Sequence, residues 1–248
     1  MLFTSNQVYT TSLLFNLLER ELYMFYHYKF WHSLTHPNNF TQAVEEGEIR
    51  GYKKRSFTVF ILFMLLFIVR EFWGMGTESL TTLFAMNHQD EYYTARLLSM
   101  VGAIAWGIIY YAFHYYGVTY LLHLLTDIPY KWIQKVQLYV MVLLLIEKTI
   151  LFTVFYLVGY TTTFSFLSLA PLVQQVLETD VVLFVINQLT IATLFTIIVQ
   201  YTFLSKWEEE SDRKVLLAKI IILHVLMAVF VGMISVLPLQ EWITRGLG

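Results

Sequence analysis

The chain contains no cysteine, and charged residues make up only 14% of its 248 positions. The missing thiols exclude disulfides, cysteine nucleophiles, and zinc or iron–sulfur sites built on cysteine. A soluble domain carries about 25% charged residues, whereas here 57% of the residues are hydrophobic and the mean hydropathy is +0.59. This composition excludes an ordinary soluble domain and indicates an integral membrane protein.

Catalytic motifs are also missing. The sequence has no G-x-S-x-G nucleophile elbow, no H-E-x-x-H zinc motif and no P-loop. His32 and His36 have the spacing of two metal ligands on a helix, but no third ligand is evident nearby and Pro37 ends the helix. The formal net charge of −2 gives no attraction to nucleic acid. We therefore expect a non-enzymatic protein without metal or cofactor, and without a nucleic-acid partner.

Five apolar segments indicate membrane spans, each of which needs about 20 mostly apolar residues. We expect an all-α, polytopic fold with five transmembrane helices at about 56–73, 95–117, 136–160, 181–204 and 215–237, which together form a transmembrane domain over residues 56–248. The second segment could continue to Leu125, in which case it either tilts or breaks at Gly117.

Residues 1–55 are expected to form a cytosolic or interfacial N-terminal region. Within it, residues 12–34 have the pattern of an amphipathic helix rich in Tyr, Phe and Trp, which suits the headgroup boundary of a bilayer. An ordinary helix packed on the inner face of the protein explains the same pattern. His36 and Pro37 end this helix, because the residue before proline is pushed out of the α region.

Lysine and arginine residues are distributed unevenly between the two sides of the expected spans. If the N-terminus is inside, the inner segments hold twelve of them, whereas the outer segments hold only Arg70, Arg96 and Arg245. The positive-inside rule then predicts an N-in, C-out topology. We expect a multi-pass protein of a bacterial cytoplasmic membrane with a cytoplasmic N-terminus. Two basic segments on the inner side are candidate docking sites for a partner: Lys53, Lys54 and Arg55, and Arg213 and Lys214.

Glu147 and Lys148 lie near the middle of the third expected span. A charged residue at that depth costs roughly 2.5–3.5 kcal/mol on insertion scales and needs a partner. Adjacent helix residues point about 100° apart, so we expect the two not to face each other. Four further polar residues lie at similar distances from the inner ends of their spans. We predict that all six form one buried polar cluster: Glu147, Lys148, His114, His224, Thr193 and Thr196. It could hold helices together, bind a partner, or form an ion or proton route.

The fourth expected span carries polar residues about every three positions: Asn187, Thr190, Thr193, Thr196 and Gln200. On a continuous helix they form one slowly drifting polar stripe. Such a stripe is more typical of a packing seam between helices than of a pore lining.

The stretch HPNNFTQAVEEGEIRGYKKRSFTVFILFMLLF at 36–67 combines a short helix that begins with proline, a basic cluster and the first span. With five closely spaced spans after it, this layout resembles bacterial members of the Yip-domain family of integral membrane proteins, over about residues 31–237. The acidic and glycine-bearing signature that precedes the spans of eukaryotic members is absent, which argues against a Rab-type GTPase partner.

The resemblance implies a non-enzymatic accessory or scaffold subunit of a membrane complex. Bacterial relatives include subunits that work beside ABC-type efflux systems, sometimes in protection against toxic peptides, so the implied partners are ABC permease and ATPase subunits. The alternative is that the chain itself is a transport-pathway (permease) subunit of an ABC exporter. In that case the inner loop at 118–135 would meet the ATPase.

Overall fold

The computed structural model describes residues 30–236, apart from 48, 50, 76, 78–79, 81–84, 86–88 and 178. The chain divides into two compact units, residues 1–53 and residues 54–248. The described part of the first unit contains α2 (Phe30–Thr35) and α3 (Pro37–Glu45). Pro37 begins α3, where its missing N–H removes no helical hydrogen bond. The expected helix at 12–34 lies outside the described residues except for its last turn in α2.

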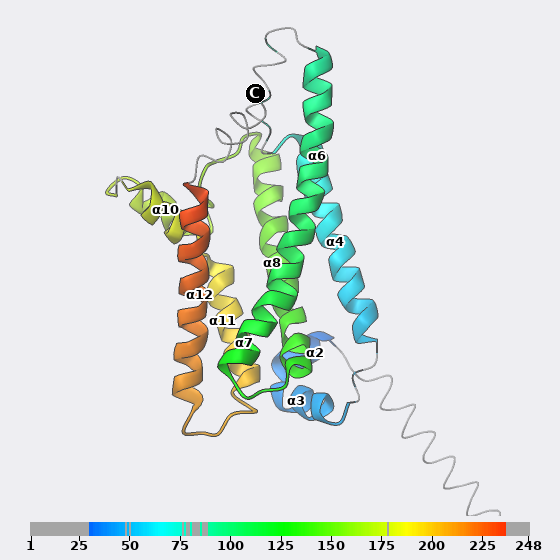
Figure 1. Cartoon of the computed structure of the whole chain (residues 1–248), viewed down its shortest axis with the longest axis vertical. Helices are drawn as coiled ribbons and strands as arrows, with labels where there is room; N and C mark the ends of the chain where they lie inside the picture. Colours follow the sequence, from blue (N-terminus) through cyan, green and yellow to red (C-terminus); the bar gives the residue numbers. More distant parts are fainter. Residues whose placement is uncertain are drawn as a thin grey trace, which may run out of the picture. The chain divides into compact units, whose positions relative to one another are not determined.

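Helices also form the second unit (Figure 1). In chain order the elements are α4 (Tyr52–Trp73, whose first two residues precede the unit boundary), α6 (Gln89–Ala112), the π-helical turn η2 (Phe113–Gly117), α7 (Val118–Leu125), α8 (Tyr130–Val158), α9 (Ala170–Val173), α10 (Asp180–Gln188), α11 (Ile191–Leu204) and α12 (Arg213–Ser235). No strand occurs among the described residues, where the β-type pairing is one isolated antiparallel bridge between Ser168 and Thr190.

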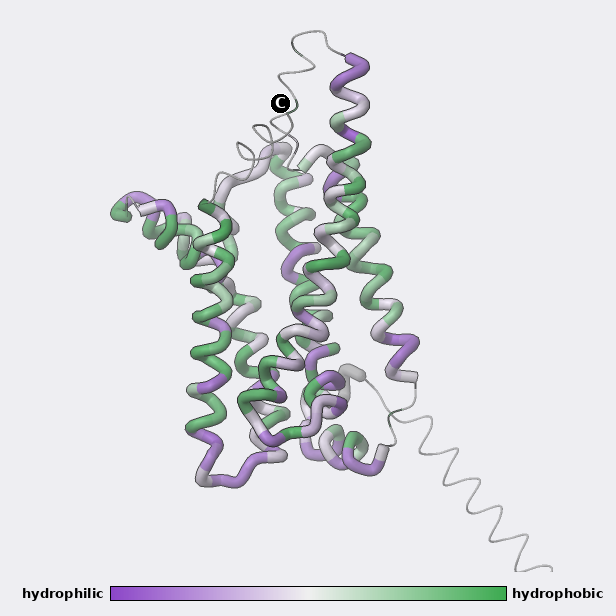
Figure 2. Tube along the Cα trace, viewed as in Figure 1, coloured by the Kyte–Doolittle hydropathy of each residue, from purple (hydrophilic) through white to green (hydrophobic). Residues whose placement is uncertain are grey.

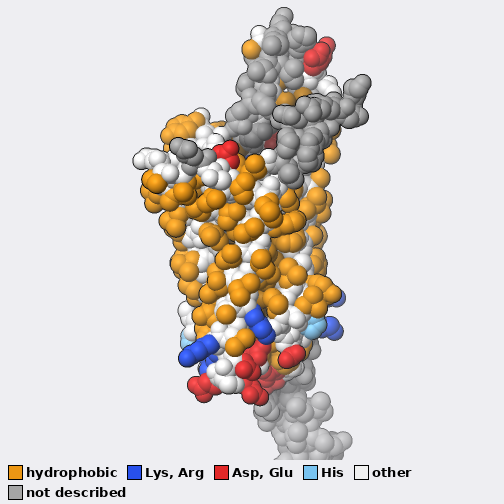
Figure 3. Space-filling view, turned by 60° about the vertical axis from the view of Figure 1, so that its left-hand side comes forward, with side chains coloured by type: hydrophobic (Ala, Val, Ile, Leu, Met, Phe, Trp, Pro, Cys, Tyr) orange, Lys and Arg blue, Asp and Glu red, His pale blue; other side chains and the backbone are white. Residues whose placement is uncertain are grey.

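Four helices are long and apolar enough to cross a membrane: α4, the continuous helix Gln89–Leu125, α8 and α12. Large apolar side chains on their outer faces are exposed, including Phe72, Leu97 and Leu226. Hydrophobic residues dominate the middle of these helices, and hydrophobic side chains cover the corresponding part of the surface (Figures 2 and 3). A soluble monomer rarely exposes so large an apolar surface. The second unit therefore has the fold of an all-helical integral membrane protein.

The fourth expected span, 181–204, is not one helix. It consists of α10 and α11, which are separated at Leu189 and Thr190. α11 has 14 residues and at 1.5 Å per residue is about 21 Å long, which is shorter than the roughly 30 Å of a bilayer core. The prediction of five continuous spanning helices is therefore not confirmed.

The second expected span does not break at Gly117. Gly117 keeps a right-handed helical conformation, and the helix continues from α6 through η2 into α7. A Cβ on Gly117 would lie 3.3 Å from the Phe113 ring, so the absent side chain leaves room for this aromatic ring one turn earlier. The expected inner loop at 118–135 is also mostly helical, because only Thr126–Pro129 separate α7 from α8.

Packing inside the unit places α8 at the centre. It contacts α7, η2 and α11, and α12 packs against both α10 and α11. α4 lies against α6 through aromatic rings: Phe60 and Phe63 meet Tyr111 edge to face, at ring distances of 5.1 and 5.9 Å. Consecutive long elements run in alternating directions (Figure 1), so α4, α8 and α12 begin at one end of the bundle and α6 and α10–α11 begin at the other.

Candidate functional site

The bundle contains a partly open cavity of about 1050 Å³, which we call the central cavity. Its wall comes from α4, α6, η2, α7, α8, α10, α11, α12 and the loop before α10. All six side chains of the predicted polar cluster line it: Glu147, Lys148, His114, His224, Thr193 and Thr196. Residues that were not part of the predicted cluster line it as well: Arg70, Glu71, Ser99, Gln137, Asn187 and Thr190.

Glu147 and Lys148 form an ion pair, with Lys148 Nζ 3.3 Å from Glu147 Oε2. The expectation that these neighbours do not meet was wrong, because the long, flexible lysine side chain spans the angle between the two Cβ directions. The glutamate side chain is 4% exposed and the lysine side chain 26%. The Lys148 ammonium also lies 5.9 Å from the centre of the Tyr110 ring, within reach of a cation–π interaction.

A second polar group crosses the bundle in a row, which we call the crossbar. Gln137 Nε2 donates to the His114 carbonyl at 2.7 Å, Gln200 Nε2 donates to Gln137 Oε1 at 3.1 Å, and His224 Nε2 lies 2.9 Å from Gln200 Oε1. The His114 carbonyl can only accept, so the NH₂ group of Gln137 faces it and the NH₂ group of Gln200 faces the Gln137 oxygen. The Gln200 oxygen then faces His224, which must donate from Nε2. The crossbar joins four elements: η2, α8, α11 and α12.

The π-helical turn η2 supplies the acceptor for this row. A π turn widens the helix and alters the regular ladder of backbone bonds, and such turns are frequent at functional sites. Thr119 reinforces the turn by donating to the Tyr115 carbonyl at 2.5 Å. Sequence reasoning did not include Gln137 in the cluster because Gln137 lies at the very start of the expected span. Gln200 was recognised only as part of the fourth-span stripe.

The crossbar and the ion pair occupy different levels of the cavity. From Gln137 to Glu147, ten residues further along α8, the axis rises about 15 Å. Gln200 is hydrogen-bonded to Gln137 and lies at the same level. The α10–α11 segment runs opposite to α8, so the same rise along it leads ten residues back from Gln200, to Thr190. Glu147 is thus level with the break between α10 and α11. The predicted residues line one cavity, but on two levels rather than in a single layer.

The break between α10 and α11 is stabilised by side chains and by a distant loop. Thr190 and Thr193 form a reciprocal capping box at the start of α11, and Thr193 Oγ1 donates to the Gln188 carbonyl at 2.9 Å. Ile191 N donates to the Leu167 carbonyl at 3.1 Å. Asn187 Oδ1 accepts from the Ser165 backbone N–H at 2.7 Å and also from the Ser168 hydroxyl. The N–H groups of Thr190, Ile191 and Thr193 and the Gln188 carbonyl therefore have partners at the break, as irregular backbone in a membrane requires.

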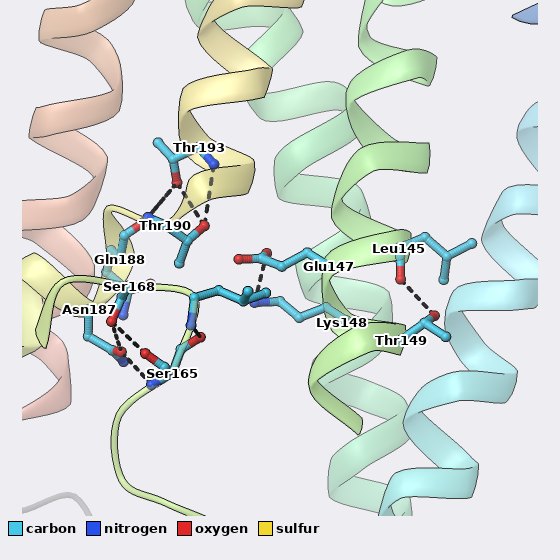
Figure 4. A network of polar contacts seen from close by, with 11 residues as sticks. Leu145, Glu147, Lys148, Thr149, Ser165, Ser168, Asn187, Gln188, Thr190 and Thr193 are labelled. Atoms are coloured by element: carbon cyan, nitrogen blue, oxygen red, sulfur yellow. Dashed lines mark hydrogen bonds and ion pairs between the residues drawn. The ribbon is translucent and has the colours of Figure 1, made fainter. Parts of the chain in front are cut away.

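The expected polar stripe on the fourth span is interrupted at this break, since Thr190 is a helix cap and not an interior residue. Figure 4 shows the Glu147 side chain directed from α8 toward the first turn of α11 and the break beside it. The positive end of the α11 dipole lies there, which favours a carboxylate. The signal that could have revealed the break is T-I-A-T at 190–193, a capping-box pattern in which Thr193 takes the place of the usual Glu or Gln.

A third polar group lies toward the opposite end of the cavity from the crossbar. Arg96 of α6 donates to the Glu71 and Phe72 carbonyls, at 2.9 and 3.1 Å, and to Thr77 Oγ1 at 2.6 Å. It thereby caps the last turn of α4. The buried Glu71 carboxylate accepts from the Ser99 hydroxyl. These contacts explain how a second carboxylate is held in the cavity wall.

The candidate docking residues lie at the end of the bundle where α4 and α12 begin. Lys54 and Lys214 are exposed, while Arg55 and Arg213 are half-buried. Arg213 donates from Nε to the Ser205 carbonyl at 3.1 Å. Lys53 is exposed and belongs to the first unit. Within the described residues, no group of three His, Asp or Glu side chains is placed to hold a metal ion.

The chain matches no protein-family model, no curated protein and no solved structure. The resemblance to the Yip-domain family therefore stays a prediction from layout, and the function must be inferred from the cavity itself.

Proposed function

We propose that this protein forms a solute pathway in a membrane, as a transport-pathway subunit. The observation that carries the proposal is the central cavity, of about 1050 Å³ and lined by polar side chains from several membrane-length helices. Ligand sites generally measure about 300–1,000 Å³ and combine apolar walls with a few polar groups. A helix broken at membrane depth is a further mark of a substrate site in transport proteins, because irregular backbone is tolerated there only inside protein or beside a cavity.

At the level of Gln137 the crossbar spans the bundle, and near it Tyr139 stacks on Phe203 with ring centres 5.4 Å apart. Toward the other end the wall continues to Glu71, Ser99 and Ser165. We infer that a solute enters from this second end and that passage requires the crossbar to separate.

The orientation follows from the charges at the two ends. α4, α8 and α12 begin with lysine and arginine residues, whereas Arg70 and Arg96 lie toward the opposite end. The positive-inside rule assigns the first end to the cytoplasm. If α10 and α11 together make the fourth crossing, the chain has five crossings, a cytoplasmic N-terminus and an outward-facing cavity in a bacterial cytoplasmic membrane.

Because the chain has no cysteine, single cysteines can test this pathway without background. Thr193→Cys lies in the cavity wall, and Leu226→Cys on an outer apolar face, 60% exposed, is the matched control. Right-side-out and inverted vesicles are treated with a membrane-impermeant methanethiosulfonate. We expect Thr193→Cys to react from the outside only, Leu226→Cys to stay unreactive, and Lys214→Cys to react from the cytoplasmic side. If Thr193→Cys is as inert as Leu226→Cys from both sides, there is no solute pathway.

The second candidate function is that of an accessory subunit of an ABC-type efflux complex. The observation in its favour is the exposed charge at the bundle end where α12 begins, at Lys214 and at the preceding turn with Glu209 and Glu210. Purification from membranes in mild detergent would test it. ABC permease and ATPase subunits that co-purify with the native chain, and are lost when Lys214 is changed to Glu, would support this role.

A further inference from the structure

Two buried oxygens in the central cavity have no hydrogen-bond partner. In the described part of the chain, the unpartnered buried side-chain oxygens are Glu147 Oε1 and Thr196 Oγ1. Both side chains are more than nine-tenths buried, at 4% and 2% exposure. Both line the central cavity, one from α8 and the other from α11. A buried acceptor without a donor costs about 1–3 kcal/mol, and more if it is charged, so these oxygens point to a group that the cavity takes up.

Several donors of the cavity wall are already engaged, and Arg70 donates from Nε to Met75 Sδ at 3.3 Å. Lys148 approaches the other glutamate oxygen, Oε2. The crossbar amides and the His224 N–H bond to one another, and the Thr193 hydroxyl donates to a backbone carbonyl. The first turn of α11 is capped by Thr190 and already faces the Glu147 carboxylate, so it is not free to hold a second anion. The unpartnered acceptor that the wall offers a ligand at this level is Glu147 Oε1.

Aromatic side chains of the same cavity define the rest of the ligand. Trp106, Tyr110 and Phe113 of the α6–η2 helix line the same cavity and form an apolar, aromatic wall. An aromatic face attracts a cation and accommodates an apolar body. A carboxylate binds an N–H donor most strongly when the donor carries a positive charge.

We propose that the central cavity binds a protonated organic amine with an apolar body, whose ammonium N–H donates to Glu147 Oε1 while Lys148 stays on Oε2. Thr196, whose level lies roughly 9 Å from that of Glu147 along the bundle, faces the ligand body or a second polar group on it. The inference rests on the proposed solute pathway, because it names the class of solute. A quaternary ammonium lacks the N–H, and an alcohol lacks the charge, so both should bind more weakly than the amine.

Titration calorimetry on the purified full chain in detergent tests this, with 2-phenylethylamine as the probe. Its N,N,N-trimethyl derivative, 2-phenylethanol and 3-phenylpropionate have similar bodies. We expect the amine to bind the unaltered protein at least tenfold more tightly than each of the other three, and Glu147→Gln to remove most of this preference. Equal binding of all four probes, preference for the anion, or no binding of the amine would overturn the proposal. The four-probe comparison does not depend on whether the variant folds.

Failure here and failure of the solute pathway can be told apart. If Thr193→Cys is labelled from outside but the amine does not bind preferentially, the pathway stands and the amine assignment is wrong. If the cavity cannot be labelled from either side, the pathway itself is refuted.

Discussion

Replacing Gln200 by Leu should weaken the bundle measurably, because this side chain is the central link of the crossbar. Gln200 is fully buried and makes two hydrogen bonds, of 3.1 Å to Gln137 and 2.9 Å to His224. Leucine keeps a similar volume and removes both bonds. In membrane proteins one interhelical hydrogen bond contributes about 0.6–1.7 kcal/mol, so the loss should be roughly 1–3 kcal/mol.

The measurement is the free energy of unfolding in mixed detergent micelles, followed by circular dichroism. Gln174→Leu is the matched control, since it makes the same chemical change at an exposed position and should stay within about 0.5 kcal/mol of the native protein. A double-mutant cycle with Gln137→Leu isolates the coupling between the two amides, expected at about 0.5–2 kcal/mol. If Gln200→Leu behaves like Gln174→Leu, or if the coupling is zero, the crossbar does not hold these helices together.

Two further substitutions test other contacts, in the same unfolding assay. Gly232→Ala should destabilise the packing of α12 on α10 by about 1–3 kcal/mol, because its Cβ would lie 2.5 Å from Val185 Cγ2 and 2.9 Å from Val185 N. Gly102→Ala is the control and should be neutral or slightly stabilising, because its Cβ meets nothing within 4 Å. Equal effects at both glycines would contradict the packing of α12 on α10. Arg96→Leu should cost about 1–3 kcal/mol, because it removes three hydrogen bonds at the end of α4. Unchanged stability of this variant would show that Arg96 does not hold α4 to α6.

The long helices could be predicted from the sequence because their signal is local. An apolar run of about 20 residues needs no distant partner to be recognised, and the expected spans at 56–73, 136–160 and 215–237 lie within α4, α8 and α12 to within a few residues. The composition alone also indicated the class of protein. The orientation of the helices across the membrane stays a prediction, because it is inferred from the distribution of lysine and arginine residues and not from the fold.

The break at Leu189 and Thr190 is only partly a local feature. Its capping box of Thr190 and Thr193 is local, although the apolar segment around it favours a continuous helix. The loop 165–168 also stabilises the break, including the bond from the Ser165 N–H to Asn187 across 22 positions, and such distant partners cannot be predicted from the local pattern. Such contacts pair backbone groups at the break, so the hydrophobic pattern gives no warning.

The ion pair of Glu147 and Lys148 was missed for a different reason. The angle between neighbouring Cβ atoms describes where side chains start, not where a four-carbon lysine side chain ends. The carboxylate is almost fully buried while the ammonium keeps partial exposure. A test of pairing from sequence must therefore include side-chain length as well as direction.

The polarity of the central cavity comes largely from neutral groups, and this bears on how such a pathway can be recognised. Besides the charged side chains of Arg70, Glu71, Glu147 and Lys148, the wall uses histidine, glutamine, asparagine, serine and threonine side chains. Neutral groups with hydrogen-bond partners are less costly in hydrocarbon than charges. A count of acidic residues in the spans therefore underestimates the polar surface. Four residues of the stripe on the fourth span line the cavity: Asn187, Thr190, Thr193 and Thr196. Gln200 joins helices, as a packing seam does. In such a wall, a single carboxylate oxygen without a partner, that of Glu147, stands out as the group with the strongest demand for a ligand.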